Sequence, residues 1–275
     1  MALLPTNVQP LVKRAAIESK RILESAVSDS PDIRELGASE TYWDQPVDRY
    51  WLLSMLLAPS VVILACLCIL RNAVITILTF HTLCCFLLPW IYMVSVRKLP
   101  VSRLLYMVEY CLRAPLYQIQ LSFALFWFVI AAGMALYVLF GFLLPNVTIV
   151  ELTKQYGLFT FGHWSLMLFM LYFAFINPVW EELFWRLFFL EFMGTSFFPH
   201  LLLQACCYAL YHLIVLLSFI QWWLAFLLFF SLIPVGLVFA FITQRLGVLC
   251  AISAHCAGDL VIMLILSNVY FRWLL

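Results

Sequence analysis

Charged side chains are scarce in this sequence, and their scarcity excludes several classes of protein. Asp, Glu, Lys and Arg make up 11% of the 275 residues, whereas hydrophobic residues make up 66%. A soluble globular chain has about 25% charged and about 45–50% apolar residues, so an ordinary soluble domain is excluded. The formal net charge of +1 gives no basic excess for binding nucleic acid. We therefore predict a multi-pass integral membrane protein in contact with the lipid bilayer, without nucleic acid as a partner.

The cysteines lack the spacing of metal ligands. Neither Cys66-Leu67-Cys68 nor the two adjacent Cys-Cys pairs match a zinc site. Most of the nine cysteines lie in apolar runs, where cysteine packs as a small hydrophobic side chain: Cys66, Cys68, Cys84, Cys85, Cys206, Cys207 and Cys250. A cleavable signal peptide is also not expected, because the first hydrophobic run starts near Trp51 and is too long for one.

Long hydrophobic runs are abundant. A helix needs about 20 apolar residues to cross the hydrocarbon core, and seven stretches qualify: Tyr50–Leu70, Ala73–Val96, Leu116–Leu144, His163–Phe192, Pro199–Leu217, Ile220–Thr243 and Val248–Val269. We predict an all-α polytopic bundle of seven to eight transmembrane helices around a membrane-embedded polar cavity. An eighth helix would come from a split of the first or fourth run. Pro178 predicts a kink in the fourth span, and His81, alone in the second, is interpreted as a packed histidine.

The chain divides into three predicted parts. Residues 1–49 form a polar N-terminal arm, with a short amphipathic helix over about 8–27. Residues 50–160 hold three spans and their loops, and residues 161–275 hold the remaining spans. The most basic loop is 97–115, and basic loops favour the cytoplasmic side. We therefore expect the arm and this loop in the cytoplasm, and the polar residues of the last part in the cytoplasmic half of the membrane.

The few charges in the last part mark a candidate site. Between His163 and Asn268 they are Glu181, Glu182, Arg186, Glu191, Arg245 and Asp259. A charge at the bilayer centre costs roughly 2.5–3.5 kcal/mol on insertion scales, so it usually faces protein or water and serves a function. Three spans contribute polar groups to the candidate site: Glu181, Glu182, Arg186, His212, His255 and Asp259.

Helix geometry predicts how these groups meet. Residues i and i+4 share a helix face, so Glu182 can reach Arg186, and His255 can reach Asp259. Glu181 lies about 100° round the helix from Glu182, and we assign it to the site. At about 1.5 Å rise per residue, Glu181, His212 and His255 all lie in the inner half of the membrane. We therefore predict that these three side chains line one cavity.

Carboxylates and imidazoles in one cavity favour hydrolysis. A carboxylate can take a proton from water, a histidine can share it, and a second donor can stabilise the oxyanion. The same donors, Glu181, His212 and His255, are also a credible zinc set with a position open for water. A proton- or cation-coupled transporter is the alternative, although no internal repeat of the kind found in many transporters is visible.

The motifs resemble those of the CAAX-protease and bacteriocin-processing (Abi) family of intramembrane endopeptidases. The family pattern is Glu-Glu-x-x-x-Arg, Phe-x-x-x-His and His-x-x-x-Asn/Asp on successive membrane helices. The matching pairs here are Glu181-Glu182 with Arg186, Tyr208 with His212, and His255 with Asp259. Tyrosine replaces phenylalanine in the second motif, and aspartate stands where asparagine is common in the third. The resemblance covers about residues 165–268.

The resemblance implies an eight-helix fold around a conical cavity, with 161–275 as the catalytic domain. It also implies that activated water cleaves a peptide bond of a membrane-associated protein or peptide. Glu181 would be the general base, His212 its partner, and His255 with Asp259 the oxyanion stabilisers. Two versions stay open: a glutamate mechanism without cofactor, or a metalloprotease with Zn²⁺. An ionised Asp259 has no proton to donate, so it would accept from His255 or help to hold a metal. Some members of the family are non-catalytic scaffolds.

Overall fold

The computed structural model describes residues 46–101, 109, 114–141, 155–157, 163–193 and 200–271. The chain forms two units, Met1–Thr41 and Tyr42–Leu275, and all described residues belong to the second. The predicted helix over 8–27, most of the loop after the third span and the predicted span ends at 142–144 and 199 lie outside the described residues. The division into three parts stays a prediction.

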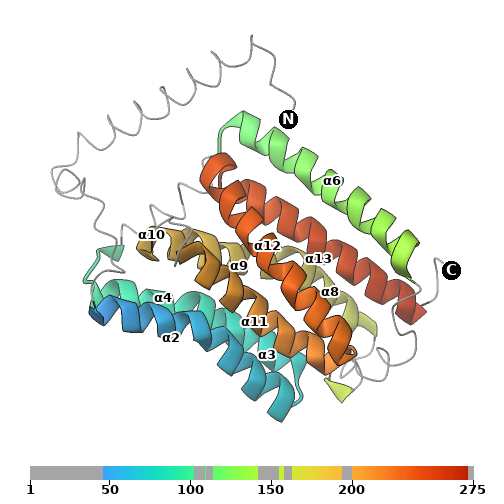
Figure 1. Ribbon diagram of the computed structural model, residues 1–275, viewed down its shortest axis with the longest axis horizontal. Helices are drawn as coiled ribbons and strands as arrows, with labels where there is room; N and C mark the ends of the chain where they lie inside the picture. The colour runs from blue at the N-terminus through green and yellow to red at the C-terminus, as the bar shows by residue number, and fades with distance from the viewer. Residues whose placement is uncertain are drawn as a thin grey trace, which may run out of the picture. The chain divides into compact units, whose positions relative to one another are not determined.

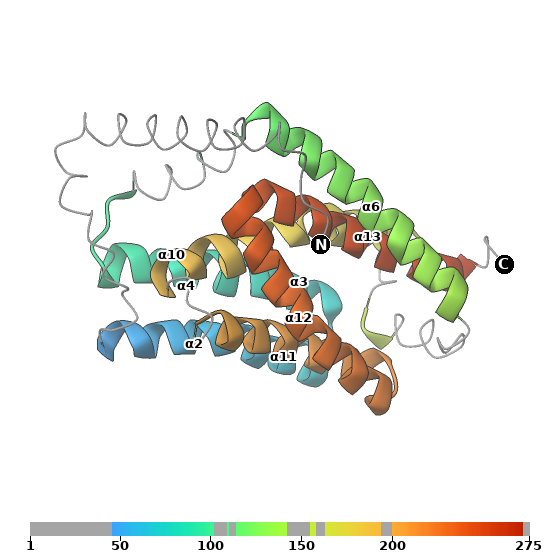
Figure 2. The same cartoon turned by 45° about the horizontal axis from the view of Figure 1, so that its top comes forward.

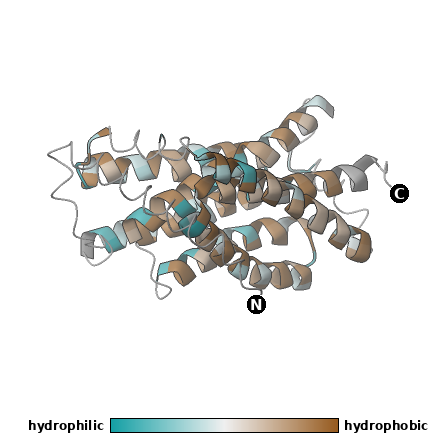
Figure 3. Cartoon of the chain, turned by 90° about the horizontal axis from the view of Figure 1, so that it is seen from above, coloured by the Kyte–Doolittle hydropathy of each residue, from teal (hydrophilic) through white to brown (hydrophobic). Residues whose placement is uncertain are grey.

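The described part of the chain is helical and contains no strand. Seven of its helices are long and apolar enough to cross a membrane: Asp48–Ile69, Ala73–Val96, Leu116–Phe140, Met167–Met193, Leu202–Phe219, Trp222–Leu246 and Val248–Ile265. Their ribbons are largely hydrophobic in Figure 3. The predicted all-α membrane bundle is confirmed with seven spans in the described residues, and the protein is a multi-pass integral membrane protein.

The first two spans form a helical hairpin with several π-helical segments. The first combines α2 (Pro46–Ile63) and η3 (Leu64–Ile69), and the second combines α3 (Ala73–Thr79), η4 (Phe80–Leu87), α4 (Leu88–Ile91) and η5 (Tyr92–Val96). At the turn, the Asn72 side chain accepts a hydrogen bond from the Ile75 amide, 3.0 Å away, and so caps α3. The turn residue Arg71 has a positive φ of 52°.

A buried aspartate joins the other ends of these two spans. Asp48 is 2% exposed and accepts two hydrogen bonds from the second span and its end. The Tyr92 hydroxyl donates over 2.7 Å, and Arg97 Nη1 donates over 2.9 Å to the other oxygen. Both carboxylate oxygens are therefore bound, as a buried charge requires.

The fourth span is broken where the sequence predicted a kink. It runs through α8 (His163–Phe175), α9 (Asn177–Glu182), the π-helical η7 (Leu183–Phe188) and α10 (Phe189–Met193). Pro178 stands in the first turn of α9, where its missing amide proton and fixed φ cost nothing. The Ile176 amide still bonds the Tyr172 carbonyl at 2.8 Å. The break confirms the prediction and sets the direction in which α9 carries its two carboxylates.

The remaining spans are α6 (Leu116–Phe140), α11 (Leu202–Phe219), α12 (Trp222–Leu246) and α13 (Val248–Phe271). Helix α13 contacts α6, α8, α9 and α12, while α11 contacts α12 on one side and α2 on the other. Figures 1 and 2 both show α6 lying along α13. Because α13 touches α9 directly, polar residues on these two helices can meet inside the protein.

A close approach of α6 to α13 gives the first testable prediction. A Cβ atom on Gly133 would lie 2.9 Å from Cγ1 of Val261, a stiff β-branched side chain. We expect Gly133→Ala to destabilise the protein by about 1–3 kcal/mol through overpacking, measured as a lower melting temperature in detergent. Gly258→Ala is the matched control, because nothing lies within 4 Å of its Cβ position. A Gly133→Ala variant as stable as the wild type would contradict this packing.

Candidate active site

Five of the six predicted site residues lie together, buried between the helices. Glu181 and Glu182 lie on α9, Arg186 on η7, and His255 and Asp259 on α13. Each of the five is at most 6% exposed. We call these five residues the polar cluster, and contacts between their side chains link α9 and η7 to α13.

Glu182 orients the histidine of the cluster. Its Oε1 lies 2.8 Å from His255 Nδ1 and 3.2 Å from Arg186 Nη1. A carboxylate only accepts hydrogen bonds when ionised, so Nδ1 of His255 carries the proton of that bond. The predicted contact between Glu182 and Arg186 is confirmed. The contact with His255 was not predicted, because it joins residues on different spans.

Asp259 is held by an asparagine and not by the histidine one turn away. The distance from Asp259 Oδ1 to His255 Nε2 is 3.7 Å, which is longer than a hydrogen bond. The other oxygen, Oδ2, accepts from Nδ2 of Asn177 at 3.0 Å. The i,i+4 proximity of His255 and Asp259 is therefore present as an ion-pair contact, while Glu182 holds the imidazole ring.

Glu181 faces away from the arginine, toward α11 and α13. Its Oε2 accepts a hydrogen bond from the Tyr211 hydroxyl and lies 3.9 Å from His255 Nε2. These contacts follow the predicted division, in which Glu182 serves Arg186 and Glu181 serves the site. Tyr211 was missed in the sequence, although its position three residues after Tyr208 places both on one helix face.

His212 lies beside the polar cluster on α11. Its Nδ1 is 2.8 Å from the Tyr208 carbonyl oxygen, which can only accept, so Nδ1 donates and Nε2 of the neutral ring is an acceptor. The ring centroid lies 4.1 Å from that of Tyr211 and 4.5 Å from that of Tyr208. His212 is thus adjacent to the tyrosine that bonds Glu181, and a shared cavity for Glu181, His212 and His255 stays a prediction.

Aromatic rings complete the surroundings of the buried arginine. The guanidinium carbon of Arg186 lies 4.4 Å from the centroid of the Tyr208 ring and 5.3 Å from that of Phe239. Cations over aromatic faces gain more when water is excluded. Arg186 therefore ties η7 to α11 and α12, in addition to its ion pair with Glu182.

His81 of the second span is linked to the polar cluster by hydrogen bonds, although it is not one of its members. His81 Nε2 lies 3.0 Å from Oδ1 of Asn177, and His81 Nδ1 lies 2.8 Å from the Tyr172 hydroxyl. Since Asn177 also bonds Asp259, a chain of hydrogen bonds runs from Tyr172 to the cluster. His81 is packed, as the sequence suggested, but its link to a site residue was not predicted.

The donors do not fit a metal site in this arrangement. Among the residues that the structure describes, no group of three or more His, Cys, Asp or Glu side chains could hold a metal ion. In the proposed set, Glu181 accepts from Tyr211, and His212 Nδ1 donates to a backbone carbonyl. His255 Nδ1 is held by Glu182.

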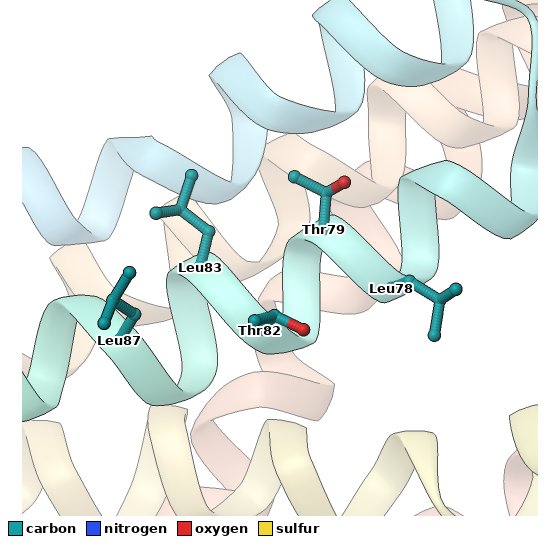
Figure 4. A pocket seen from close by; sticks show the side chains of 5 residues that line it. All are labelled: Leu78, Thr79, Thr82, Leu83 and Leu87. Atoms are coloured by element: carbon teal, nitrogen blue, oxygen red, sulfur yellow. The ribbon is translucent and has the colours of Figure 1, made fainter.

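An open pocket of about 390 Å³ lies elsewhere, along the second span. Figure 4 shows its lining side chains, which are Leu78, Thr79, Thr82, Leu83 and Leu87. They offer two hydroxyls and no titratable group. This pocket therefore lacks the groups that hydrolysis needs, and the polar cluster remains the candidate active site.

Comparison with known proteins bears on the same residues. Residues 163–261 match the sequence model of the family described as type II CAAX prenyl endopeptidase Rce1-like. The matched segment contains all six predicted site residues, and it confirms the resemblance inferred from their motifs. Neither the curated proteins nor the solved structures gave a match.

Proposed function

Since residues 163–261 belong to the Rce1-like family of type II CAAX prenyl endopeptidases, we propose that this membrane protein is an intramembrane endopeptidase. It would hydrolyse a peptide bond of a membrane-associated protein or peptide. The observation that carries the proposal is the Glu181 carboxylate beside an imidazole that a second carboxylate orients. This pairing supplies both a proton acceptor and a directed donor inside the membrane.

Glu181 acts as the general base in this proposal. It takes one proton from a water molecule while the water oxygen attacks the carbonyl carbon of the substrate. The carbonyl π electrons move to oxygen and form a tetrahedral oxyanion. When the C–N bond breaks, Glu181 returns the proton to the leaving nitrogen, and a carboxyl group and an amine result. Tyr211 fixes the Glu181 carboxylate through its hydrogen bond.

His255 is placed to stabilise the oxyanion. Because Glu182 holds Nδ1 at 2.8 Å, Nε2 is directed toward Glu181 and Asp259, at 3.9 and 3.7 Å. As an imidazolium, His255 donates from both nitrogens, so Nε2 can donate to the developing negative charge. Asp259 is an acceptor when ionised, and it serves to orient this donor.

His212 provides a second proton acceptor. With Nδ1 donating to the Tyr208 carbonyl, its Nε2 carries a lone pair when the ring is neutral. It can share the proton that Glu181 takes from water. This role depends on His212 facing the same cavity as Glu181, and the ring contact with Tyr211 supports that placement.

The family name points to peptides with a prenylated cysteine near the C-terminus, and we propose this substrate class. An attached isoprenoid would hold the peptide at the membrane, where the polar cluster lies. The amino terminus and loop 97–115 would face the cytoplasm by the positive-inside rule. The site would then open toward the cytoplasmic half of the bilayer.

A cleavage assay tests the proposed function. The full-length protein in liposomes is mixed with matched peptides, prenylated and unprenylated, and mass spectrometry identifies the products. We expect two fragments whose summed mass exceeds the substrate by one water. No cleavage across the panel would refute the endopeptidase. Ion uptake by the same liposomes would then favour the transporter, and no activity of either kind would favour a scaffold.

Metal removal distinguishes the glutamate mechanism from the zinc metalloprotease mechanism. Because no group of three His, Cys, Asp or Glu side chains among the described residues is placed to hold a metal ion, we expect cleavage to continue at an unchanged rate after treatment with a strong chelator. Adding zinc back should leave the rate unchanged. Loss of cleavage with chelator, followed by recovery with zinc but not magnesium, would contradict this expectation and establish the metalloprotease version.

A further inference from the structure

We propose that His81, in the second span, is a positioning residue that acts on Asp259 through Asn177. The inference rests on the proposed function of the polar cluster. His81 lies outside the segment that matches the family, so the N-terminal spans would contribute directly to the geometry of the active site.

The residues form a continuous chain of hydrogen bonds from Tyr172 to Asp259. The Tyr172 hydroxyl lies 2.8 Å from His81 Nδ1, His81 Nε2 lies 3.0 Å from Asn177 Oδ1, and Asn177 Nδ2 lies 3.0 Å from Asp259 Oδ2. His81 and Asn177 are each 3% exposed, and Asp259 is 6% exposed. The chain thus joins η4, α8, α9 and α13, and it is buried from His81 to Asp259.

The chemistry of the groups fixes the direction of every bond. The carboxylate of Asp259 accepts, so the amide nitrogen of Asn177 donates to it. The amide oxygen of Asn177 accepts from Nε2–H of His81, and Nδ1 of the neutral ring then accepts from the Tyr172 hydroxyl. All three donors point toward Asp259. Hydrogen bonds aligned in this way polarise one another in a buried site.

The chain determines where the free oxygen of Asp259 points. A carboxylate rotates over a broad range about its terminal torsion. With Oδ2 bound to Asn177, Oδ1 is held 3.7 Å from His255 Nε2. Asn177 alone could rotate its amide, but His81 binds the amide oxygen and prevents this. His81 therefore sets the position of the carboxylate that faces the proposed oxyanion donor.

Ring packing keeps His81 in this orientation. Its ring lies 6.3 Å from that of Trp180, at an interplanar angle of 24°, and 5.2 Å from that of Phe80. Trp180 is on α9, the helix that carries Glu181 and Glu182. The imidazole is consequently fixed by Phe80 of its own span and by Trp180 of α9, the helix that also carries Asn177.

Two near-isosteric variants test the link. The amide nitrogen of glutamine can reach the place of histidine Nε2, whereas that of asparagine reaches only the place of Nδ1. We expect His81→Asn to lower kcat by about 10- to 100-fold with little change in KM, because small misplacements in an active site are costly. We expect His81→Gln to retain most of the wild-type kcat. Thr76→Val is the matched control, since this buried hydroxyl bonds only within its own span, to the Asn72 carbonyl.

A double-variant cycle shows whether His81 acts through Asp259. In an Asp259→Ala background, His81→Asn should cause no further loss of kcat. If His81→Asn fails to fold, Asn177→Leu tests the same link with the same expected loss. Equal activity of His81→Asn and His81→Gln, or a full additional loss in the Asp259→Ala background, would overturn the inference alone. Absence of cleavage by the wild type would instead overturn the proposed function on which it rests.

Discussion

Replacing Glu181 by glutamine is expected to lower kcat for peptide hydrolysis by about 10²–10⁴-fold, the usual effect of removing a general base. Glutamine keeps the size and the hydrogen-bond acceptor that meets Tyr211, but its amide cannot take a proton from water. KM should change little, because the substitution removes a proton acceptor but keeps the size of the side chain. Initial rates at several peptide concentrations in liposomes give both constants.

Glu191→Gln is the matched control for this experiment. Glu191 lies on α10 in the same span, and its side chain is exposed, so the substitution should leave kcat unchanged. His212→Ala should also lower kcat if His212 shares the proton that Glu181 takes from water. Full turnover by Glu181→Gln would show that Glu181 is not the general base, whatever the activity of the other variants.

Replacing Arg186 by leucine is expected to destabilise the protein by about 3–5 kcal/mol, because it breaks a buried ion pair by removing one of its partners. The Arg186 and Glu182 side chains are at most 2% exposed and are 3.2 Å apart. The variant also loses the contacts of the guanidinium with the rings of Tyr208 and Phe239. Thermal or denaturant unfolding in detergent measures the loss.

Arg245, in the last turn of α12, provides the control. Arg245 is exposed, so Arg245→Leu should change the free energy of unfolding by about 0.5 kcal/mol or less. In a Glu182→Gln background, Arg186→Leu should cost less than in the wild type, because the unpaired charge is gone. An unchanged unfolding midpoint for Arg186→Leu would show that the ion pair contributes nothing to stability.

The parts of the fold that depend on local sequence could be predicted. Span lengths follow from hydrophobic runs, the break at Ile176 follows from Pro178, and the contact of Glu182 with Arg186 follows from helix periodicity. The π-helical segments could not be predicted, because the hydrophobic pattern of a buried membrane helix is nearly uniform around its axis. Their boundaries depend on how neighbouring helices pack.

The partners within the site depend on contacts between spans, which the sequence does not reveal. His255 is held by Glu182, 73 residues earlier, although Asp259 stands one turn away on its own helix. Asn177 was not singled out in the sequence, and His81 was interpreted as an isolated packed histidine. Their contacts became visible only when η4, α9 and α13 were placed side by side.

The two joints of the first hairpin have a mechanical consequence for the active site. Asp48 closes one end of the hairpin through Tyr92 and Arg97, and at the other end the Asn72 amide donates to the Cys66 carbonyl of the first span over 3.2 Å. We expect a helix pair joined at both ends to shift as one body. His81 lies between these two ends of the hairpin. Any shift of the hairpin against α9 would therefore displace the Asn177 amide, which His81 binds. Through the hydrogen bond from Asn177, the carboxylate of Asp259 would change its orientation while α13 stays in place.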